Sequence, residues 1–125
     1  MNVVDSSAWL EYFADGPNAG FFAPAIERTD TLLVSVISLY EVFKKVSQAR
    51  DEDHALQAIA SMQHGRVVEL DGPLALYAAR LSVEKRLPMA DSIILATARL
   101  HRAILWTQDA DFEGLPGVRF RPRQT

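Results

Sequence analysis

Cysteine is absent from this chain, and so are long hydrophobic runs. The first absence excludes a disulfide framework, a thiolate zinc site and any chemistry that needs a reactive thiol. No apolar run reaches the roughly 18 residues that a membrane-spanning helix needs, and residues 1–10 carry no basic stretch ahead of an apolar core. We therefore expect a cytoplasmic protein with no membrane partner.

A basic excess is also missing, since the formal net charge is −3 and the pI is about 5.5. Proteins that hold nucleic acid by bulk electrostatics usually carry a basic excess, so that mode of binding is disfavoured. Clustered carboxylates that bind cations can nevertheless attract phosphate, and an acidic chain can act on RNA in this way. With 49% hydrophobic and 23% charged residues, the 125 positions predict one globular domain spanning residues 1–125.

Short β-rich runs alternate with longer helical patterns along the chain. Five runs are candidate strands: Met1–Val4, Leu32–Val36, Arg66–Leu70, Ala103–Thr107 and Val118–Arg121. Three of them contain consecutive apolar residues, as expected for strands that helices cover on both faces. This alternation predicts an α/β fold with a parallel sheet.

Helices are predicted between these strands. Two stretches, starting at Leu39 and Leu74, have apolar residues at i, i+3, i+4 and i+7. Another helix should cover Asp53–Gln63 and end at Gly65 as a left-handed C-cap. The last long helix should run from about Ala90 to His101, after a break that proline imposes at position 88.

Two further helix signals lie near turn-forming residues. Asp71-Gly72-Pro73 has the composition of a helix start. The segment Asn18–Glu27 contains a glycine and a proline that interrupt its helical pattern, so we expect a kinked or late-starting helix there.

Four acidic residues fall at corresponding positions of the predicted elements. Asp5 follows the first strand, and Glu41 lies in the first turn after the second strand. Asp91 begins the last long helix, and Asp109 follows the fourth strand. In a parallel sheet, the C-terminal ends of the strands and the N-termini of the returning helices share one edge, where α/β proteins bind ligands. We expect the four carboxylates to gather there.

Each of these acids also has a purely structural interpretation. Asp5 could be a helix N-cap, and Asp91 could be stabilised by the helix dipole at an N-terminus. Asp109 and Asp111 could be ordinary turn residues. No single position therefore proves a functional site.

Glu41 is the most ambiguous of the four. Ser38 and Glu41 fit the S-x-x-E pattern of a capping box. Glu41 could also pair with Lys44 or Lys45 on the same helical face.

Taken together, the acids indicate a metal site. Carboxylates that converge repel one another, and this repulsion is tolerated chiefly when a cation or a shared proton compensates it. Mg²⁺ takes oxygen ligands and requires no cysteine or histidine. His54, His64 and His101 show no close ligand spacing, and we expect them at the surface.

The acids lie within four segments: Val3–Leu10, Ser35–Val42, Met89–Ala98 and Trp106–Phe112. In this order and spacing, across nearly the whole chain, they resemble the PIN domain and, within it, the VapC-type toxins of bacterial toxin–antitoxin pairs. The resemblance implies a three-layer α/β/α fold, with about five parallel strands of which the first and fourth are adjacent. It also implies an endoribonuclease that depends on Mg²⁺, for which Mn²⁺ can substitute.

Residue by residue, the resemblance assigns the catalytic and metal-binding roles to four acids: Asp5, Glu41, Asp91 and Asp109. Asp111 is the alternative to Asp109 as the fourth acid. Ser6 and Thr107 fall where family members place a hydroxyl near the carboxylates, so we expect supporting roles for them. A carboxylate could help to deprotonate the attacking water, and either Asp91 or Glu41 could serve.

The expected partners are RNA, a small antitoxin that covers the acidic edge, and a second copy of the chain in a homodimer. Scattered cations could contact RNA, although most should be solvated helix positions: Lys44, Lys45, Arg80, Lys85, Arg86, Arg99 and Arg102. Three arginines occupy alternate positions from the fifth predicted strand onward and could line one face of the protein: Arg119, Arg121 and Arg123. We expect Trp9 and Trp106 to be core or interface residues.

Three alternatives remain open. A PIN-domain nuclease that processes RNA need not be a toxin, and a PIN-like protein can be catalytically inactive. A phosphoacceptor of the response-regulator receiver type is similar in length and charge. It would need an acidic pair after the first strand and a late lysine, whereas this chain has Asp5-Ser6 and no lysine beyond Lys85.

Overall fold

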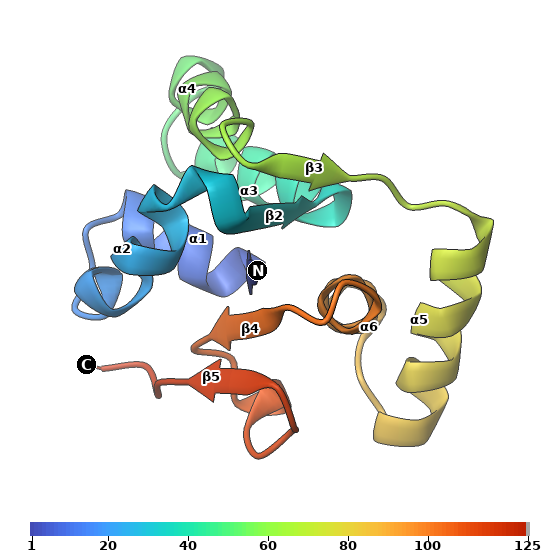
Figure 1. The fold of residues 1–125 in the computed structure, drawn as a ribbon. Coiled ribbons are helices and arrows are strands. Elements are labelled where there is room, and N and C mark those ends of the chain that lie inside the picture. Colours follow the sequence, from blue (N-terminus) through green and yellow to red (C-terminus); the bar gives the residue numbers. More distant parts are fainter. Residues whose placement is uncertain (125) are drawn as a thin grey trace.

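The computed structural model describes residues 1–124 and forms three layers, with helices on both faces of a sheet (Figure 1). The sheet has the order β3-β2-β1-β4-β5, and all four strand pairs are parallel. Its strands are β1 (Asn2–Val4), β2 (Leu32–Ser35), β3 (Arg66–Val68), β4 (Ile104–Thr107) and β5 (Val118–Phe120). The five predicted strands and the adjacency of the first and fourth are confirmed.

Two hydrophobic clusters pack on the two faces of the sheet. Successive strand residues point to opposite faces, so Val3 belongs to one cluster and Val4 to the other, and both are fully buried. The Val4 cluster involves α1 (Ser6–Phe13), α2 (Ala19–Glu27), α3 (Val36–Ala49) and α4 (Glu52–Met62). The Val3 cluster involves α5 (Gly72–Lys85) and α6 (Met89–Leu100). The strands therefore contain consecutive apolar residues because both faces of the sheet are buried.

The predicted start of α5 and the predicted break before α6 are confirmed. The Asp71 carboxylate accepts a hydrogen bond from the Leu74 N–H at 2.9 Å, and proline occupies the first turn. Arg86 closes α5 in the left-handed conformation at φ 56°, and Pro88 then precedes α6. This short reversal precedes the N-terminus of α6, where Asp91 lies in the first turn.

The predicted left-handed C-cap at Gly65 is wrong. The helix α4 ends at Met62, and its last turn is closed by the Gln63 N–H, which donates to the Ile59 carbonyl oxygen at 3.0 Å. Gly65 does not have a positive φ. A Cβ atom there would lie 2.8 Å from Leu32 Cγ and 3.0 Å from the Leu32 carbonyl oxygen. Glycine is needed because the chain passes closely over β2.

The segment with the expected kink or late start forms a helix from Ala19 to Glu27, with Pro24 inside it. Its start is not late, since it begins one residue after Asn18. Burial of Phe22, Ala25 and Ile26 against the sheet offsets the hydrogen bond that Pro24 cannot donate. Within residues 1–124, no helix combines the length and apolar character that crossing a membrane requires.

Candidate functional site

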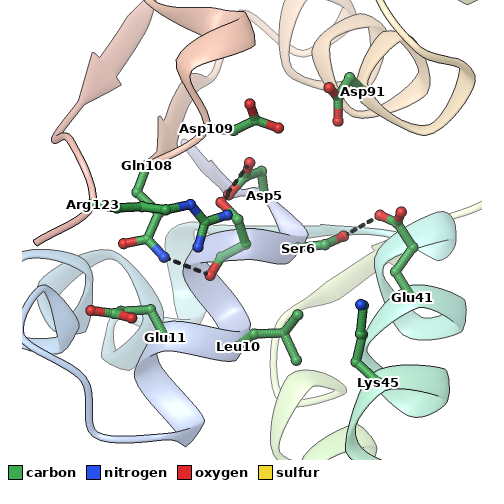
Figure 2. A pocket seen from close by; sticks show the side chains of 11 residues that line it. Asp5, Ser6, Leu10, Glu11, Glu41, Lys45, Asp91, Gln108, Asp109 and Arg123 are labelled. Carbon is green, nitrogen blue, oxygen red and sulfur yellow. Dashed lines mark hydrogen bonds between the residues drawn. The ribbon is translucent and has the colours of Figure 1, made fainter. Parts of the chain in front are cut away.

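A cavity of about 320 Å³ opens at the edge where β1 and β4 end, and all four predicted acids line it (Figure 2). Asp5 and Asp109 follow the two central strands, whereas Asp91 and Glu41 come from helices on opposite faces of the sheet. The structure therefore brings together residues that are up to 104 positions apart in the sequence. Ser6 also lines this cavity, beside Asp5.

Asp5 is both a helix N-cap and a member of the acidic site. Its Oδ1 accepts from the Ala8 N–H at 2.9 Å, and the Ser7 hydroxyl donates to the same oxygen at 2.8 Å. The side chain is only 2% exposed, and this burial raises the pKa of its carboxyl to about 6, although the hydrogen bonds act in the opposite direction. The neighbouring Asp109 also raises this pKa. The structural interpretation of Asp5 is correct and compatible with the functional one.

Thr107 connects the two acids that follow the central strands. Its buried hydroxyl donates to Asp5 Oδ2 at 2.7 Å and accepts from the Asp109 N–H at 2.9 Å. Both contacts use one oxygen atom, so the position of Asp5 is tied to the backbone after β4. The expected supporting role of Thr107 thus has a clear geometric basis.

Asp91, Asp109 and Asp111 form a tight cluster on the α6 side of the cavity. Each offers a carboxylate oxygen, and the three oxygens lie within 4.8 Å of one another. The pKa of Asp91 is raised to about 8, first by burial and then by the charges of Asp109, Asp111 and Asp5. Asp109 also accepts from the Asp111 N–H at 2.9 Å as the N-cap of a 3-10 turn, η2 (Ala110–Phe112). Both candidates for the fourth acid therefore lie beside Asp91, and Asp109 is the one that lines the cavity.

Glu41 is not part of a capping box, so this structural alternative is wrong. The helix α3 starts at Val36, directly after β2, which places Ser38 and Glu41 inside the helix and leaves Ser35 as the N-cap. Glu41 Oε1 instead accepts a 2.6 Å hydrogen bond from the Ser6 hydroxyl, which also lies 3.1 Å from Ser38 Oγ. Figure 2 shows this contact between α1 and α3.

The alternative ion pairs of Glu41 are also not observed. Within residues 1–124, Glu41 makes no ion pair with Lys44 or Lys45. Lys44 lies over the Tyr40 ring at 5.9 Å from its centroid, whereas Lys45 lines the cavity near Glu41 (Figure 2). Ser6 is therefore the residue that holds Glu41.

The donor set of the cavity fits a hard divalent cation. Its clustered donors are carboxylate oxygens, the ligands that Mg²⁺ prefers. The raised pKa values of Asp5 and Asp91 indicate that two acids are held in a position where their ionised forms are unfavourable. A cation bound among them would reverse this effect, so the residues fit the expected metal site.

A buried amide network behind the cavity was not predicted from the sequence. Asn18 Nδ2 donates to Gln108 Oε1 and to the Pro122 carbonyl oxygen, both at 3.0 Å, and Gln108 Nε2 donates to the Ser7 carbonyl oxygen at 3.3 Å. The Asn18 N–H donates to Glu11 Oε2 at 2.7 Å. Only Gln108 carried a signal, because it stands between two motif residues. Asn18 lies outside all four motif segments.

The remaining sequence predictions can be placed directly. Trp9 is fully buried and Trp106 is 8% exposed, so both are core residues as expected. His54 is a surface residue that pairs with Asp51 at 2.7 Å. Of the cations named as RNA contacts, Lys45 and Arg123 line the acidic cavity.

Comparisons with known proteins agree with this geometry. The PIN domain family model matches residues 3–118. A chain from a toxin–antitoxin complex of Klebsiella pneumoniae is 27% identical with a TM-score of 0.78, over 95% of this chain and 96% of that one. A search of curated protein sequences found no match.

Two more distant structures show the same fold. VapC20 of Mycobacterium tuberculosis, described as a sarcin-ricin loop cleaving toxin, is 18% identical with a TM-score of 0.77, over 93% of this chain and 95% of that one. A chain of VapBC2 from Rickettsia felis, bound to a DNA fragment from its promoter, is 15% identical with a TM-score of 0.73, over 97% of both chains. Because the family model matches most of the chain, this protein belongs to the PIN domain family.

Proposed function

We propose that this protein is a Mg²⁺-dependent endoribonuclease that serves as the toxin of a type II toxin–antitoxin pair. The observation that carries the proposal is the convergence of Asp91, Asp109 and Asp111 beside the buried Asp5, at the ligand-binding edge of a PIN fold. Clustered carboxylates repel one another and lower the stability of the fold. Such a destabilising arrangement is expected at a functional site.

In the proposed site, Asp5, Asp91 and Asp109 hold the metal, with Asp111 beside them and Glu41 facing them from α3. The bound Mg²⁺, or Mn²⁺ in its place, would neutralise charge on the scissile phosphate and lower the pKa of the attacking water. Thr107 and Ser7 keep the Asp5 carboxylate in a fixed orientation through hydrogen bonds of 2.7 and 2.8 Å.

Glu41 has a separate role in this proposal. Its Oε1 is engaged by Ser6 and stands outside the cluster of three aspartates. The hydrogen bond fixes the carboxylate on the cavity wall, where it can accept a proton from the attacking water or complete the metal site. Asp91 is the other candidate for the proton acceptor because it lies in the aspartate cluster where the attacking water would be bound.

The proposed toxin role also implies specific binding partners. We propose RNA as the substrate, a small antitoxin that covers the acidic edge, a homodimer, and action in the cytoplasm. Support comes from the relative in the Klebsiella pneumoniae toxin–antitoxin complex, which covers nearly the whole chain. The alternatives are a PIN-domain RNA-processing enzyme without an antitoxin and an inactive PIN-like binding protein. A receiver-like phosphoacceptor is not supported, because the family match is to the PIN domain.

The test is brief induction of the chain without a partner, followed by sequencing of RNA ends, together with cleavage by the purified protein. We expect slowed growth, new RNA ends at defined sites, and cleavage in Mg²⁺ or Mn²⁺ that EDTA abolishes. Equal cleavage in excess EDTA would contradict the metal mechanism. Growth arrest with unchanged RNA ends would contradict the nuclease assignment.

A further inference from the structure

Three exposed arginines follow one another at alternate positions along β5 and the residues after it: Arg119, Arg121 and Arg123. Arg119 lies in β5, and Arg121 and Arg123 follow at alternate positions in the residues after the strand. Val118, the residue before Arg119, packs against the hydrophobic cluster on the opposite face. This arrangement concentrates positive charge on one edge of a protein whose net charge is −3.

Aromatic rings hold two of these guanidinium groups. The Arg119 guanidinium carbon lies 4.9 Å from the centroid of a Trp106 ring, and that of Arg121 lies 5.1 Å from the Phe21 ring. The two rings are themselves 5.3 Å apart, so they form one platform from β4 and α2. A guanidinium that stacks on a ring keeps its N–H groups at its margin available for hydrogen bonds. Within residues 1–124, none of the three arginines is paired with a carboxylate.

The row of arginines leads to the acidic cavity. The Arg121 N–H donates to the Thr107 carbonyl oxygen at 3.0 Å, and the next carbonyl, of Pro122, accepts from the buried Asn18. These bonds fix the backbone up to Arg123, whose side chain reaches over the cavity beside Gln108 (Figure 2). The buried amide network therefore orients the last arginine toward the acids.

We propose that Arg119, Arg121 and Arg123 form a phosphate track that guides the backbone of single-stranded RNA into the acidic cavity. The inference rests on the proposed nuclease function and adds the path of its substrate. Phosphates repeat at regular intervals along an RNA strand, and the arginines recur at every second residue along this edge. RNA is favoured over an acidic protein segment because the track ends where a phosphodiester bond would be cleaved.

The test measures binding of a short fluorescently labelled single-stranded RNA at several salt concentrations, in an Asp91→Asn background that prevents cleavage. Each phosphate contact contributes about 0.7 to the slope of log affinity against log salt for single strands. Replacing both Arg119 and Arg121 by glutamine should therefore reduce this slope by about 1.4 and weaken binding about tenfold or more at low salt. The matched control is Arg66→Gln, an exposed arginine on β3 at the opposite edge of the sheet, which should change neither quantity.

A second variant separates charge from orientation. Phe21→Leu keeps every arginine but removes the ring beneath Arg121, so binding should weaken about threefold while the slope remains that of the parent protein. A melting curve reports whether the packing of Phe21 against Trp106 has been lost more widely. A Phe21→Leu protein with parental affinity would overturn the proposed aromatic platform.

The outcomes distinguish the track from the nuclease. If the natural protein cleaves RNA but the glutamine variant binds it like Arg66→Gln, the track is wrong and the nuclease stands. If no RNA is cleaved in Mg²⁺ or Mn²⁺ while the variant still loses RNA affinity, the nuclease fails and the track stands. An unlabelled polyglutamate peptide can be compared with unlabelled RNA of equal charge as a competitor of the labelled RNA. If the peptide displaces the labelled RNA equally well, this edge recognises acidic protein and the RNA assignment is overturned.

Discussion

The two walls of the acidic cavity hold their carboxylates in different ways. On the α6 side, Asp91 lies against Asp109 and Asp111, and burial together with these charges raises its pKa to about 8. On the α3 side, Glu41 stands outside this cluster and accepts a 2.6 Å hydrogen bond from Ser6. The first wall concentrates repulsion, whereas the second holds one acid through a hydroxyl donor.

This difference shows two ways in which the fold can hold carboxylates close together although they repel one another. The three aspartates are short side chains attached to the start of a helix and to the turn after a strand, so backbone packing fixes their separation. Glu41 has a longer side chain within a helix and needs a partner to fix its carboxylate. A metal should therefore relieve strain on the aspartate wall, and precise orientation should matter most on the glutamate wall.

Removing a charge from the aspartate wall should have the largest effect on activity. Asp91→Asn should reduce cleavage about 10³-fold or more, because a metal ligand is weakened, yet should raise the melting temperature of the metal-free protein by relieving repulsion. Added Mg²⁺ should then stabilise the natural protein more than the variant. Equal Mg²⁺-induced shifts in melting temperature would show that Asp91 does not share a cation site.

The strain on Asp5 should appear as a pH dependence of stability. The folded carboxyl titrates at about 6 and the unfolded one near 3.8, so the metal-free native state binds more protons between these values and loses stability as the pH rises through them. Asp5→Asn lacks this loss. Its stability relative to the natural protein should increase by up to about 3 kcal/mol from pH 4 to pH 7, measured by urea unfolding in EDTA. A difference that is constant with pH would contradict the raised pKa.

On the glutamate wall, Glu41→Gln keeps the size and the hydrogen bond from Ser6 but removes the charge. We expect cleavage to fall about 10²-fold while the free energy of unfolding changes by less than about 1 kcal/mol. Glu84→Gln, an exposed site on α5, is the matched control for loss of one negative charge. Single-turnover cleavage decides the matter, and a variant as active as the control would remove Glu41 from the chemistry.

The smallest effect should come from the hydroxyl that holds Glu41. Ser6→Ala removes no carboxylate but deletes the hydroxyl that donates to Glu41. Cleavage should fall about tenfold because the Glu41 carboxylate is no longer oriented. This factor corresponds to the roughly 1.5 kcal/mol of a charge-assisted hydrogen bond. Ser38→Ala is the control, since Ser38 contacts Ser6 and not Glu41. If both variants cleave equally well, Ser6 does not position Glu41.

The sequence predicts the aspartate wall better than the glutamate wall. Asp5 and Asp109 lie within two residues of the ends of apolar strands, and these ends are visible in the residue pattern, so their meeting at one edge follows from parallel topology. The start of α3 is less visible, because helix follows strand without a loop and Ser38 imitates an N-cap. The contact between Ser6 and Glu41 spans 35 residues and depends on how α1 packs against α3. No local pattern encodes it.

The same distinction applies to the fold. Asp71 and Pro88 act through local backbone chemistry, and the sequence predicts both. Glycine is required at position 65 because the backbone passes close to Leu32, which lies 33 positions earlier in the chain. A rule based on the local sequence instead explains this glycine as a helix C-cap, which is wrong. Asn18 is similar, because its partners Gln108 and Pro122 meet it only in the folded chain.

The position of β4 between β1 and β5 also sets an order of events during synthesis. The ribosome makes Asp5 and Glu41 early, but Asp91, Thr107 and Asp109 come from the last third of the printed sequence. Until β4 has been translated and has paired with β1, Asp5 lacks its Thr107 donor and the cavity lacks Asp109. Under the proposed nuclease function, a nascent chain would therefore be unable to cleave the RNA beside it until this central strand is in place.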